Sequence, residues 1–189
     1  MKNLKTLAIA LLVVVSATTV TAQTQKIDVA KSKINWVGKK VTGKHEGTVS
    51  LNEGSLVFKA KKVVGGSFVV NMNSVTVTDL KAGQGKEDLE GHLKADDFFG
   101  SEKFPTATLT FKSIGEKSAN LYNVTADLTI KGITQPVKFE LAVKENVATT
   151  AFKVDRTKYD IKYGSGNFFE NLGDKTINDD FELIVSLQL

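Results

Sequence analysis

Hydrophobic and polar residues alternate along most of the chain beyond residue 22. In residues 122–130 every even-numbered position is apolar and every odd-numbered position is polar. A period of two is typical of a β-strand with one buried face. Residues 137–143 alternate in the same way, and Lys131-Gly132 predicts a tight turn that joins these two strands as an antiparallel hairpin. Six further runs show the pattern: residues 34–41, 48–58, 67–77, 106–114, 148–154 and 181–189. We therefore expect eight strands.

Two segments interrupt the alternation. Residues 86–99 place Leu89 and Leu93 four positions apart among charged residues, which predicts a short amphipathic helix that ends near Gly100. Residues 164–180 contain Phe168 and Phe169 among glycine, asparagine and aspartate. A connection of this length is more often a lid or a binding loop than a connection without a function. The alternative is that the two rings plug one end of the core.

Eight sequential antiparallel strands and one helix predict an all-β fold, an eight-stranded barrel with a long C-terminal lid loop. A barrel of this size is either filled by its own side chains or holds one slender ligand, as lipocalins do. The alternation does not distinguish these two states. The candidate ligand-binding residues are large and apolar, and nine come from the strands and two from the loop: Trp36, Phe58, Phe68, Met72, Phe111, Leu128, Phe139, Phe152 and Phe181, with Phe168 and Phe169.

The N-terminus has the pattern of a secretory signal peptide. Lys2 and Lys5 precede an unbroken apolar run at residues 7–15, and small residues lead to a cleavage pattern at Ala22. The run covers only about half of the roughly 20 residues that a bilayer requires. We therefore expect residues 1–22 to be removed and residues 23–189 to form one exported domain, periplasmic or secreted, without an integral membrane segment.

Composition excludes several kinds of chemistry. The chain has no cysteine, so a disulfide, a thiolate nucleophile and a lipid anchor at the cleavage site are all ruled out. Removal of Lys2 and Lys5 leaves 23 basic side chains against 21 acidic ones, and the lysines are scattered. A nearly neutral chain without a basic patch gives no reason to expect nucleic acid as a partner.

No catalytic or metal-binding motif is complete. Residues 38–44 match the start of a phosphate-binding P-loop, but His45 stands where the motif requires serine or threonine. The two histidines, His45 and His92, are 47 residues apart and lack the short spacing of metal ligands. We expect no catalytic residue, no metal and no cofactor. The competing interpretation is that His92 acts with the carboxylates around it: Glu87, Asp88, Glu90, Asp96 and Asp97.

Four segments of the chain carry distinctive sequence motifs in a fixed order. The most distinctive is residues 126–137, which read Ala-Asp-Leu-Thr-Ile-Lys-Gly-Ile-Thr-Gln-Pro-Val. The others are residues 92–99, which begin His-Leu, residues 103–108 with Phe-Pro, and residues 155–161 with Asp-Arg-Thr. Together these four segments resemble the YceI-like family of exported bacterial lipid-binding and polyisoprenoid-binding proteins. The resemblance spans essentially all of the chain beyond residue 22. One departure is that Leu89 and Glu90 stand where many members carry an Arg-Asp pair.

The resemblance implies a lipocalin-like barrel with a helix packed across it and an isoprenoid chain in its lumen. The expected activity is non-enzymatic binding, transport or storage of a polyprenyl chain, a quinone or a polyprenyl phosphate. Two alternatives stay open: a small lipid-modifying hydrolase or isomerase that uses His92, and a stress or adhesion protein whose barrel is filled. The oligomeric state is also open, with a homodimer among the candidates.

Overall fold

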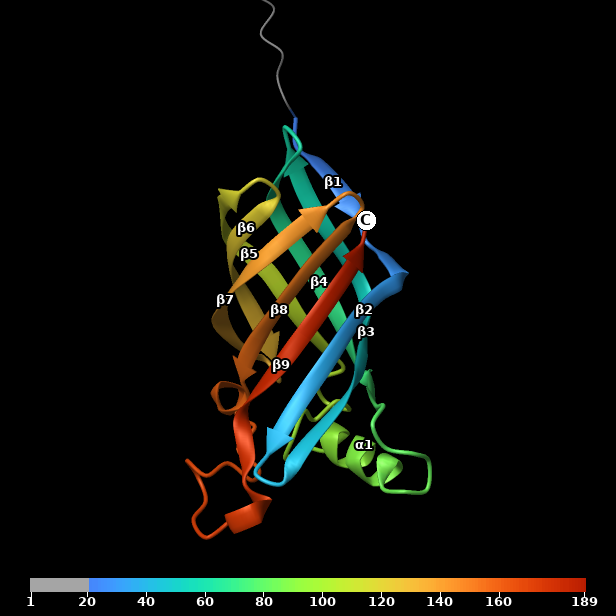
Figure 1. Ribbon diagram of the computed structural model, residues 1–189, viewed down its shortest axis with the longest axis vertical. Helices are drawn as coiled ribbons and strands as arrows, with labels where there is room; N and C mark the ends of the chain where they lie inside the picture. The colour runs from blue at the N-terminus through green and yellow to red at the C-terminus, as the bar shows by residue number, and fades with distance from the viewer. Residues whose placement is uncertain (1–20) are drawn as a thin grey trace, which may run out of the picture.

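The computed structural model describes residues 21–189, which form a closed antiparallel β-barrel (Figure 1). The predicted signal peptide lies, except for its last two residues, outside the described residues. All eight predicted strands are present, each longer than its alternating run. The barrel strands are β2 (Asp28–Lys40), β3 (Gly43–Lys59), β4 (Lys62–Val77), β5 (Thr106–Ser118), β6 (Leu121–Ile130), β7 (Ile133–Lys144), β8 (Val147–Asp155) and β9 (Ile177–Gln188).

Each strand pairs with the next strand along the chain, and β9 pairs back with β2 to close the barrel. The closing register places Trp36 beside Leu183 and Gly38 beside Phe181. The predicted hairpin joins β6 and β7, where Ile130 pairs with Ile133. Its turn residues Lys131 and Gly132 have φ of 51° and 73°, as the two central residues of a type I′ turn require.

A ninth strand, β1 (Gln23–Lys26), was not predicted from the sequence. It pairs with the second half of β3, in the register Gln23 to Phe58 and Lys26 to Ser55. Its sequence, Gln-Thr-Gln-Lys, has no apolar position, and all four residues are exposed. Hydrogen bonds to a neighbouring strand hold this segment, and such bonds leave no trace in an alternation pattern.

The alternation in β6 sets which side chains enter the barrel. Its even-numbered residues are buried, from Tyr122 at 3% exposure to Ile130 at 5%, and Asn123 is exposed to water. The same rule in β7 buries Phe139 and Leu141. Because the side-chain period is two, one face of every strand faces the lumen.

The helix α1 (Lys86–Lys94) is shorter than predicted. It stops at Ala95, whose backbone is extended, five residues before Gly100. The C-terminal part of the predicted helix instead forms turns, in which Gly100 N–H donates to Ala95 C=O at 2.8 Å and Ser101 N–H to Lys94 C=O at 3.0 Å. Gly100 has a φ of 56° in these turns rather than at the end of the helix.

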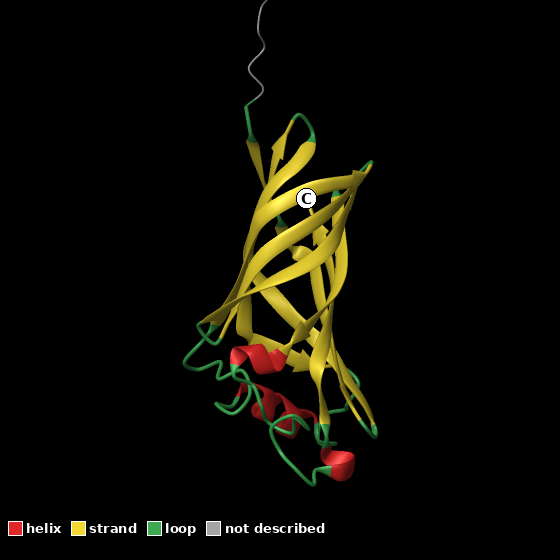
Figure 2. Ribbon diagram, turned by 90° about the vertical axis from the view of Figure 1, so that its left-hand side faces the viewer, coloured by secondary structure: helices red, strands yellow, loops and turns green. Residues whose placement is uncertain are grey.

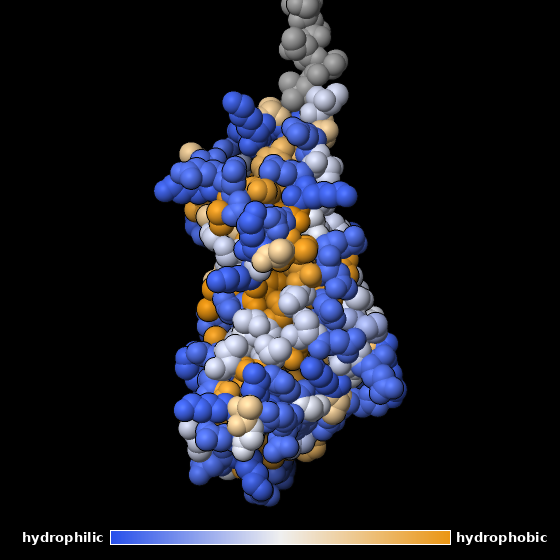
Figure 3. Space-filling model, turned by 90° about the vertical axis from the view of Figure 1, so that its right-hand side faces the viewer, coloured by the Kyte–Doolittle hydropathy of each residue, from blue (hydrophilic) through white to orange (hydrophobic). Residues whose placement is uncertain are grey.

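The two ends of the barrel differ (Figures 1 and 2). One end, called the capped end below, carries α1, the β2–β3 hairpin and the long loop before β9. The other end carries β1, the C-terminus and the β3–β4, β5–β6 and β7–β8 turns. On the side shown in Figure 3 both ends are hydrophilic, and hydrophobic residues are visible at mid-height. No helix within residues 21–189 is long and apolar enough to cross a membrane.

Candidate functional site

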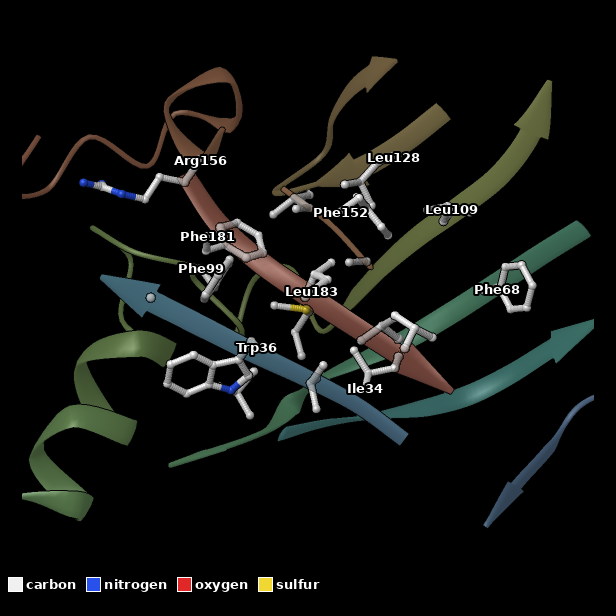
Figure 4. Close-up of a pocket in the computed structure, with 18 of the residues that line it drawn as sticks. Ile34, Trp36, Phe68, Phe99, Leu109, Leu128, Phe152, Arg156, Phe181 and Leu183 are labelled. Atoms are coloured by element: carbon white, nitrogen blue, oxygen red, sulfur yellow. The ribbon is translucent and has the colours of Figure 1, made fainter. Parts of the chain in front are cut away.

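The barrel encloses a cavity of about 170 Å³ whose walls are almost entirely apolar. The lumen is therefore partly hollow, which the sequence pattern did not settle. Figure 4 shows Trp36, Phe99 and Phe181 on the side of the cavity nearest α1, with Phe68 on the far side. Every barrel strand contributes lining residues, because the inward face of each strand is apolar.

Eight of the eleven candidate residues line this cavity: Trp36, Phe68, Met72, Phe111, Leu128, Phe139, Phe152 and Phe181. The other three do not, which corrects the sequence expectation. Phe58 packs against the core from the end opposite α1 without reaching the cavity. Phe168 and Phe169 are each 50% exposed, so they neither line the lumen nor plug it.

Four phenylalanine rings form a continuous series of ring contacts in the lumen, called the aromatic stack below. Phe68 of β4 lies 5.7 Å from Phe111 of β5, which lies 5.9 Å from Phe139 of β7. Phe139 and Phe152 of β8 are stacked nearly parallel, with their ring centroids 4.8 Å apart. These contacts link four strands of the barrel.

The capped end is closed by Leu93 at the end of α1 and by Phe98 and Phe99 in the turns that follow it, all of which line the cavity. Phe99 N–H donates to Leu93 C=O at 3.1 Å, and the Phe99 ring lies 6.1 Å from that of Phe181 on β9. Lys131 Nζ in the β6–β7 turn donates to Asp96 C=O at 2.8 Å. The cap is thus held by β9 and by the β6–β7 turn.

Arg156 is a buried cation at the capped end, and sequence reasoning did not place it at the site. It opens the 3₁₀ helix η1 (Arg156–Tyr159) and is 2% exposed. Its guanidinium donates to the carbonyls of Ile161, Ile177 and Asn178 at 2.8 to 3.1 Å. Asp179 Oδ1 lies 3.6 Å away.

Burial lowers the pKa of Arg156, while the carboxylate of Asp179 acts in the opposite direction. The Arg156 guanidinium carbon also lies 5.8 Å from the centre of the Phe98 ring, within cation–π range. Because three carbonyls already satisfy this cation, its evident role is to join η1, the start of β9 and the cap.

The sequence pattern also missed aliphatic lining residues, including Leu183, Val185 and Leu187 of β9. They follow the same alternation as Phe181, so counting every second residue onward from Phe181 would have found them. Two polar atoms in the lining, Trp36 Nε1 and Thr150 Oγ1, are buried without a hydrogen-bond partner among the described residues. An unsatisfied buried donor or acceptor costs about 1–3 kcal/mol, so a polar atom of a ligand could relieve part of that cost.

The two histidines lie in separate places and do not converge. His45 Nδ1 lies 2.9 Å from Asp79 Oδ2 near the β2–β3 hairpin. His92 Nε2 on α1 lies 3.4 Å from Asp97 Oδ2, and the His92 ring contacts Tyr163 with a centroid distance of 4.4 Å. Neither histidine lines the cavity. Within residues 21–189 no three histidine, aspartate or glutamate side chains are grouped as a metal site.

The carboxylates near His92 are largely engaged elsewhere. Glu87 Oε2 accepts from Gly83 N–H at 3.0 Å, and Glu90 Oε1 accepts from Val77 N–H at 2.8 Å, which fixes α1 to the end of β4. Lys103 Nζ donates to Asp96 at 2.5 Å. Asp97 is the carboxylate that pairs with His92.

A second cavity, of about 490 Å³, lies on the outer face of β2, β8 and β9, beneath the loop before β9. Its walls carry Lys39, Lys153, Asp155 and Glu182 together with loop residues. A polar, solvent-exposed cleft of this kind does not favour an apolar chain, so the lumen is the candidate site.

Comparison with known protein families identifies a match that covers most of the chain. The profile of the YceI-like domain matches residues 25–189. Protein YceI of Escherichia coli O157:H7 is 32% identical over 94 residues, or 50% of this chain and 46% of that protein. A UPF0312 protein of Shewanella denitrificans is 35% identical over 85 residues, or 45% of this chain and 42% of that protein. The matched segments thus span less than half of each relative.

Solved structures share the fold. BcnA of Burkholderia cenocepacia superposes with a TM-score of 0.68 at 22% identity, covering 85% of this chain and 98% of BcnA. A polyisoprenoid-binding domain from Saccharophagus degradans, implicated in plant cell wall breakdown, superposes with a TM-score of 0.57 at 16% identity. That match covers 89% of this chain and 97% of that domain.

Proposed function

The chain belongs to the YceI-like family, and from that premise we propose that it binds the apolar chain of an isoprenoid lipid in its barrel lumen without acting as an enzyme. The observation that carries this proposal is the cavity inside the barrel, whose wall is almost wholly apolar. The Saccharophagus degradans domain described as polyisoprenoid-binding, which has the same fold, supports the choice of ligand class.

Burial of apolar surface supplies the driving force. Each buried CH₂ group contributes about 0.8 kcal/mol, so a five-carbon isoprene unit contributes about 4 kcal/mol. A prenyl chain therefore needs no polar contact for tight binding. A quinone or another head group with a hydrogen-bonding atom would additionally find Trp36 Nε1 or Thr150 Oγ1, neither of which has a hydrogen-bond partner within residues 21–189.

The size of the cavity determines what binding requires. A cavity of about 150 Å³ holds one benzene molecule, so about 170 Å³ accommodates little more than one isoprene unit. A longer chain needs more space than this, and rearrangement of the aromatic stack of Phe68, Phe111, Phe139 and Phe152 would supply it. Ring size in this stack should therefore control the chain length that binds best.

A binding protein fits the site better than an enzyme. A lipid in the lumen is separated from His92, which lies outside the cavity lining and packs against Tyr163. General acid–base catalysis needs the catalytic group within hydrogen-bond reach of the reacting atom. If His92→Ala abolished turnover of a prenyl lipid, the enzymatic alternative would replace this proposal.

The first experiment is mass spectrometry of an organic extract from protein purified from its native host. We expect an isoprenoid lipid at about one molecule per barrel, as a single-file lumen of eight strands implies. A folded preparation that yields only background lipid and does not bind added prenyl quinone would contradict the proposal.

The second experiment compares Phe139→Leu with Phe58→Leu. Phe139 lies in the aromatic stack, whereas Phe58 is a phenylalanine of the same barrel that does not line the cavity. With prenyl alcohols of increasing length, we expect Phe139→Leu to shift the largest thermal stabilisation towards longer chains. Phe58→Leu should keep the wild-type order, and an equal shift in both variants would show that the stack does not set ligand length.

A further inference from the structure

More than half of the exposed large hydrophobic side chains lie at one end of the molecule. Seven such residues occur among the described ones, and four lie at the capped end: Val41, Tyr163, Phe168 and Phe169. Val41, in the β2–β3 hairpin, is 64% exposed, and its N–H donates to Thr176 C=O at 3.2 Å. The hairpin tip and residues 163–176, called the aromatic loop below, are therefore adjacent.

The aromatic loop holds its two phenylalanines outward in a fixed turn. Ser165 is fully buried, and its carbonyl accepts from the N–H groups of both Phe168 and Phe169 at 3.1 and 3.0 Å. Ile177 N–H donates to Gly164 C=O at 2.8 Å, which closes the base of the loop. The exposure of the rings follows from this turn, so little ordering is needed before they enter an apolar phase.

We propose that the aromatic loop is a membrane-docking element that inserts Phe168 and Phe169 into the surface of an electrically neutral lipid bilayer. Figures 1 and 2 show the loop projecting beyond the end of the barrel. A convex apolar projection suits a deformable apolar phase, whereas a protein partner would have to supply a pocket of matching shape. The choice of a bilayer also rests on the proposed function, because a lipid carrier has to collect its ligand from a membrane.

The loop itself carries no net charge that favours an anionic bilayer over a neutral one, and the exposed cations at this end, Lys39 and Lys40, lie in the adjacent hairpin. Residues 163–176 contain Glu170, Asp174 and Lys175 and so carry a small net negative charge. Just before them, Lys162 Nζ pairs with Asp160 Oδ1 at 2.7 Å and lies 5.2 Å from the Phe168 ring centre. The loop itself therefore attracts anionic lipid only weakly, and its apolar rings provide the affinity.

Docking in this orientation would place the lumen against the bilayer at its capped end. Tyr163, at the start of the loop, contacts His92 of α1, and α1 leads into the Phe98 and Phe99 cap of the cavity. The loop and the cap are thus in contact, and a lipid leaving the lumen at this end would emerge beside the inserted rings.

The absence of cysteine allows a local test in the whole chain. Glu170→Cys carries an environment-sensitive dye next to Phe169, and Glu53→Cys carries the same dye on the outer wall of β3, where Glu53 is also exposed. With phosphatidylcholine vesicles we expect a blue shift and quenching by brominated lipid at position 170 and not at position 53. Raising the ionic strength to about 1 M, where the Debye length is about 3 Å, should leave the signal unchanged.

Matched variants show which side chains insert into the bilayer. In the Glu170→Cys background, each of Phe168→Ser and Phe169→Ser should weaken vesicle partitioning by about five- to tenfold, as expected when half of a phenylalanine side chain is no longer transferred from water. Val64→Ser, which removes an apolar side chain 48% exposed near the opposite end, should have no effect. Circular dichroism confirms that each variant is folded.

Three results would overturn the docking proposal: no shift at position 170, partitioning that survives both phenylalanine substitutions, or partitioning that requires anionic lipid and disappears at high salt. A vesicle-independent dimer that Phe168→Ser dissociates would likewise assign the rings to a second copy of the chain. Leu183→Gln, in the lumen, separates the two proposals, because it should impair isoprenoid binding and leave docking intact. Docking without any isoprenoid binding would contradict the proposed function alone.

Discussion

Leu183 and Ile184 are neighbours in β9 whose side chains lie on opposite faces of the barrel wall. Leu183 lines the cavity between Trp36 of β2 and Phe152 of β8, and Ile184 is 43% exposed. Leu183→Gln places an amide in the apolar lumen and should cost about 1–3 kcal/mol of unfolding free energy and reduce isoprenoid affinity.

Ile184→Gln is the matched control, because it also replaces an aliphatic side chain by an amide, but on the outer, solvent-facing side of the barrel wall. It should alter stability by less than about 0.5 kcal/mol and leave ligand binding unchanged. Urea unfolding and ligand titration measure both effects. Equal loss of binding in the two variants would show that the ligand does not occupy the lumen.

Asp79 supplies a pH-dependent contribution to stability. Burial would raise the pKa of Asp79, but hydrogen bonds from Glu46 N–H and His45 hold it below its usual value of 3.8. A depressed folded-state pKa contributes stability that is fully present above the unfolded pKa and is lost as pH falls through the folded value.

Asp79→Asn should therefore destabilise the protein at pH 5 by about 1 kcal/mol, the typical net contribution of one hydrogen bond. The difference from the wild type should shrink steadily below pH 4. Thermal unfolding of both proteins at several pH values measures it. A difference that stays constant down to pH 2.5 would mean that the Asp79 carboxylate is not the group responsible.

At the scale of the strand, Gly47 allows β2, β3 and β4 to approach one another. A Cβ atom at this position would lie 1.8 Å from Thr76 C=O and 2.6 Å from the Trp36 ring, which lies over the glycine. Gly47→Ala should destabilise the barrel by more than about 3 kcal/mol, because the closest atom belongs to backbone and cannot rotate away.

Gly115 in β5 is the control for that substitution, since a Cβ atom there would meet nothing within 4 Å. Gly115→Ala should be neutral or stabilise the protein by about 0.5 kcal/mol, because it reduces the backbone freedom of the unfolded chain. Chemical denaturation separates the two variants. Similar stabilities would indicate that β3 shifts to accept the methyl group at position 47.

At the scale of the whole molecule, β1 begins at Gln23, directly after the predicted signal-peptide cleavage site at Ala22. We predict that the mature chain begins at Gln23, because Ala22 ends the small-residue pattern behind the apolar run at residues 7–15. Cleavage there would leave every residue of β1 available to pair with β3. The intact mass of the exported protein tests this, and a membrane fraction that retains residues 1–22 would show that the segment is an anchor.

The sequence by itself determined the strands of the barrel, their order and their inward faces. Alternation is a local property. In a strand, each side chain points to the face opposite those of its two neighbours and to the same face as the side chains two positions away. A chain with eight such runs joined by short turns has few ways to pair them, and closure into a barrel removes the exposed edges. For the same reason, eight of the eleven candidate residues line the cavity.

Only the tertiary structure decided three features: how much of the lumen is empty, that the Phe168 and Phe169 rings are exposed, and which carbonyls Arg156 binds. The cavity is the small difference between the space that eight strands enclose and the volume of the side chains they send inward, so no single strand specifies it. Ser165 turns Phe168 outward through backbone hydrogen bonds that any sequence can make. Arg156 donates to the carbonyl of Asn178, which is 22 residues later in the sequence. The two groups come close in space only when β9 has closed the barrel.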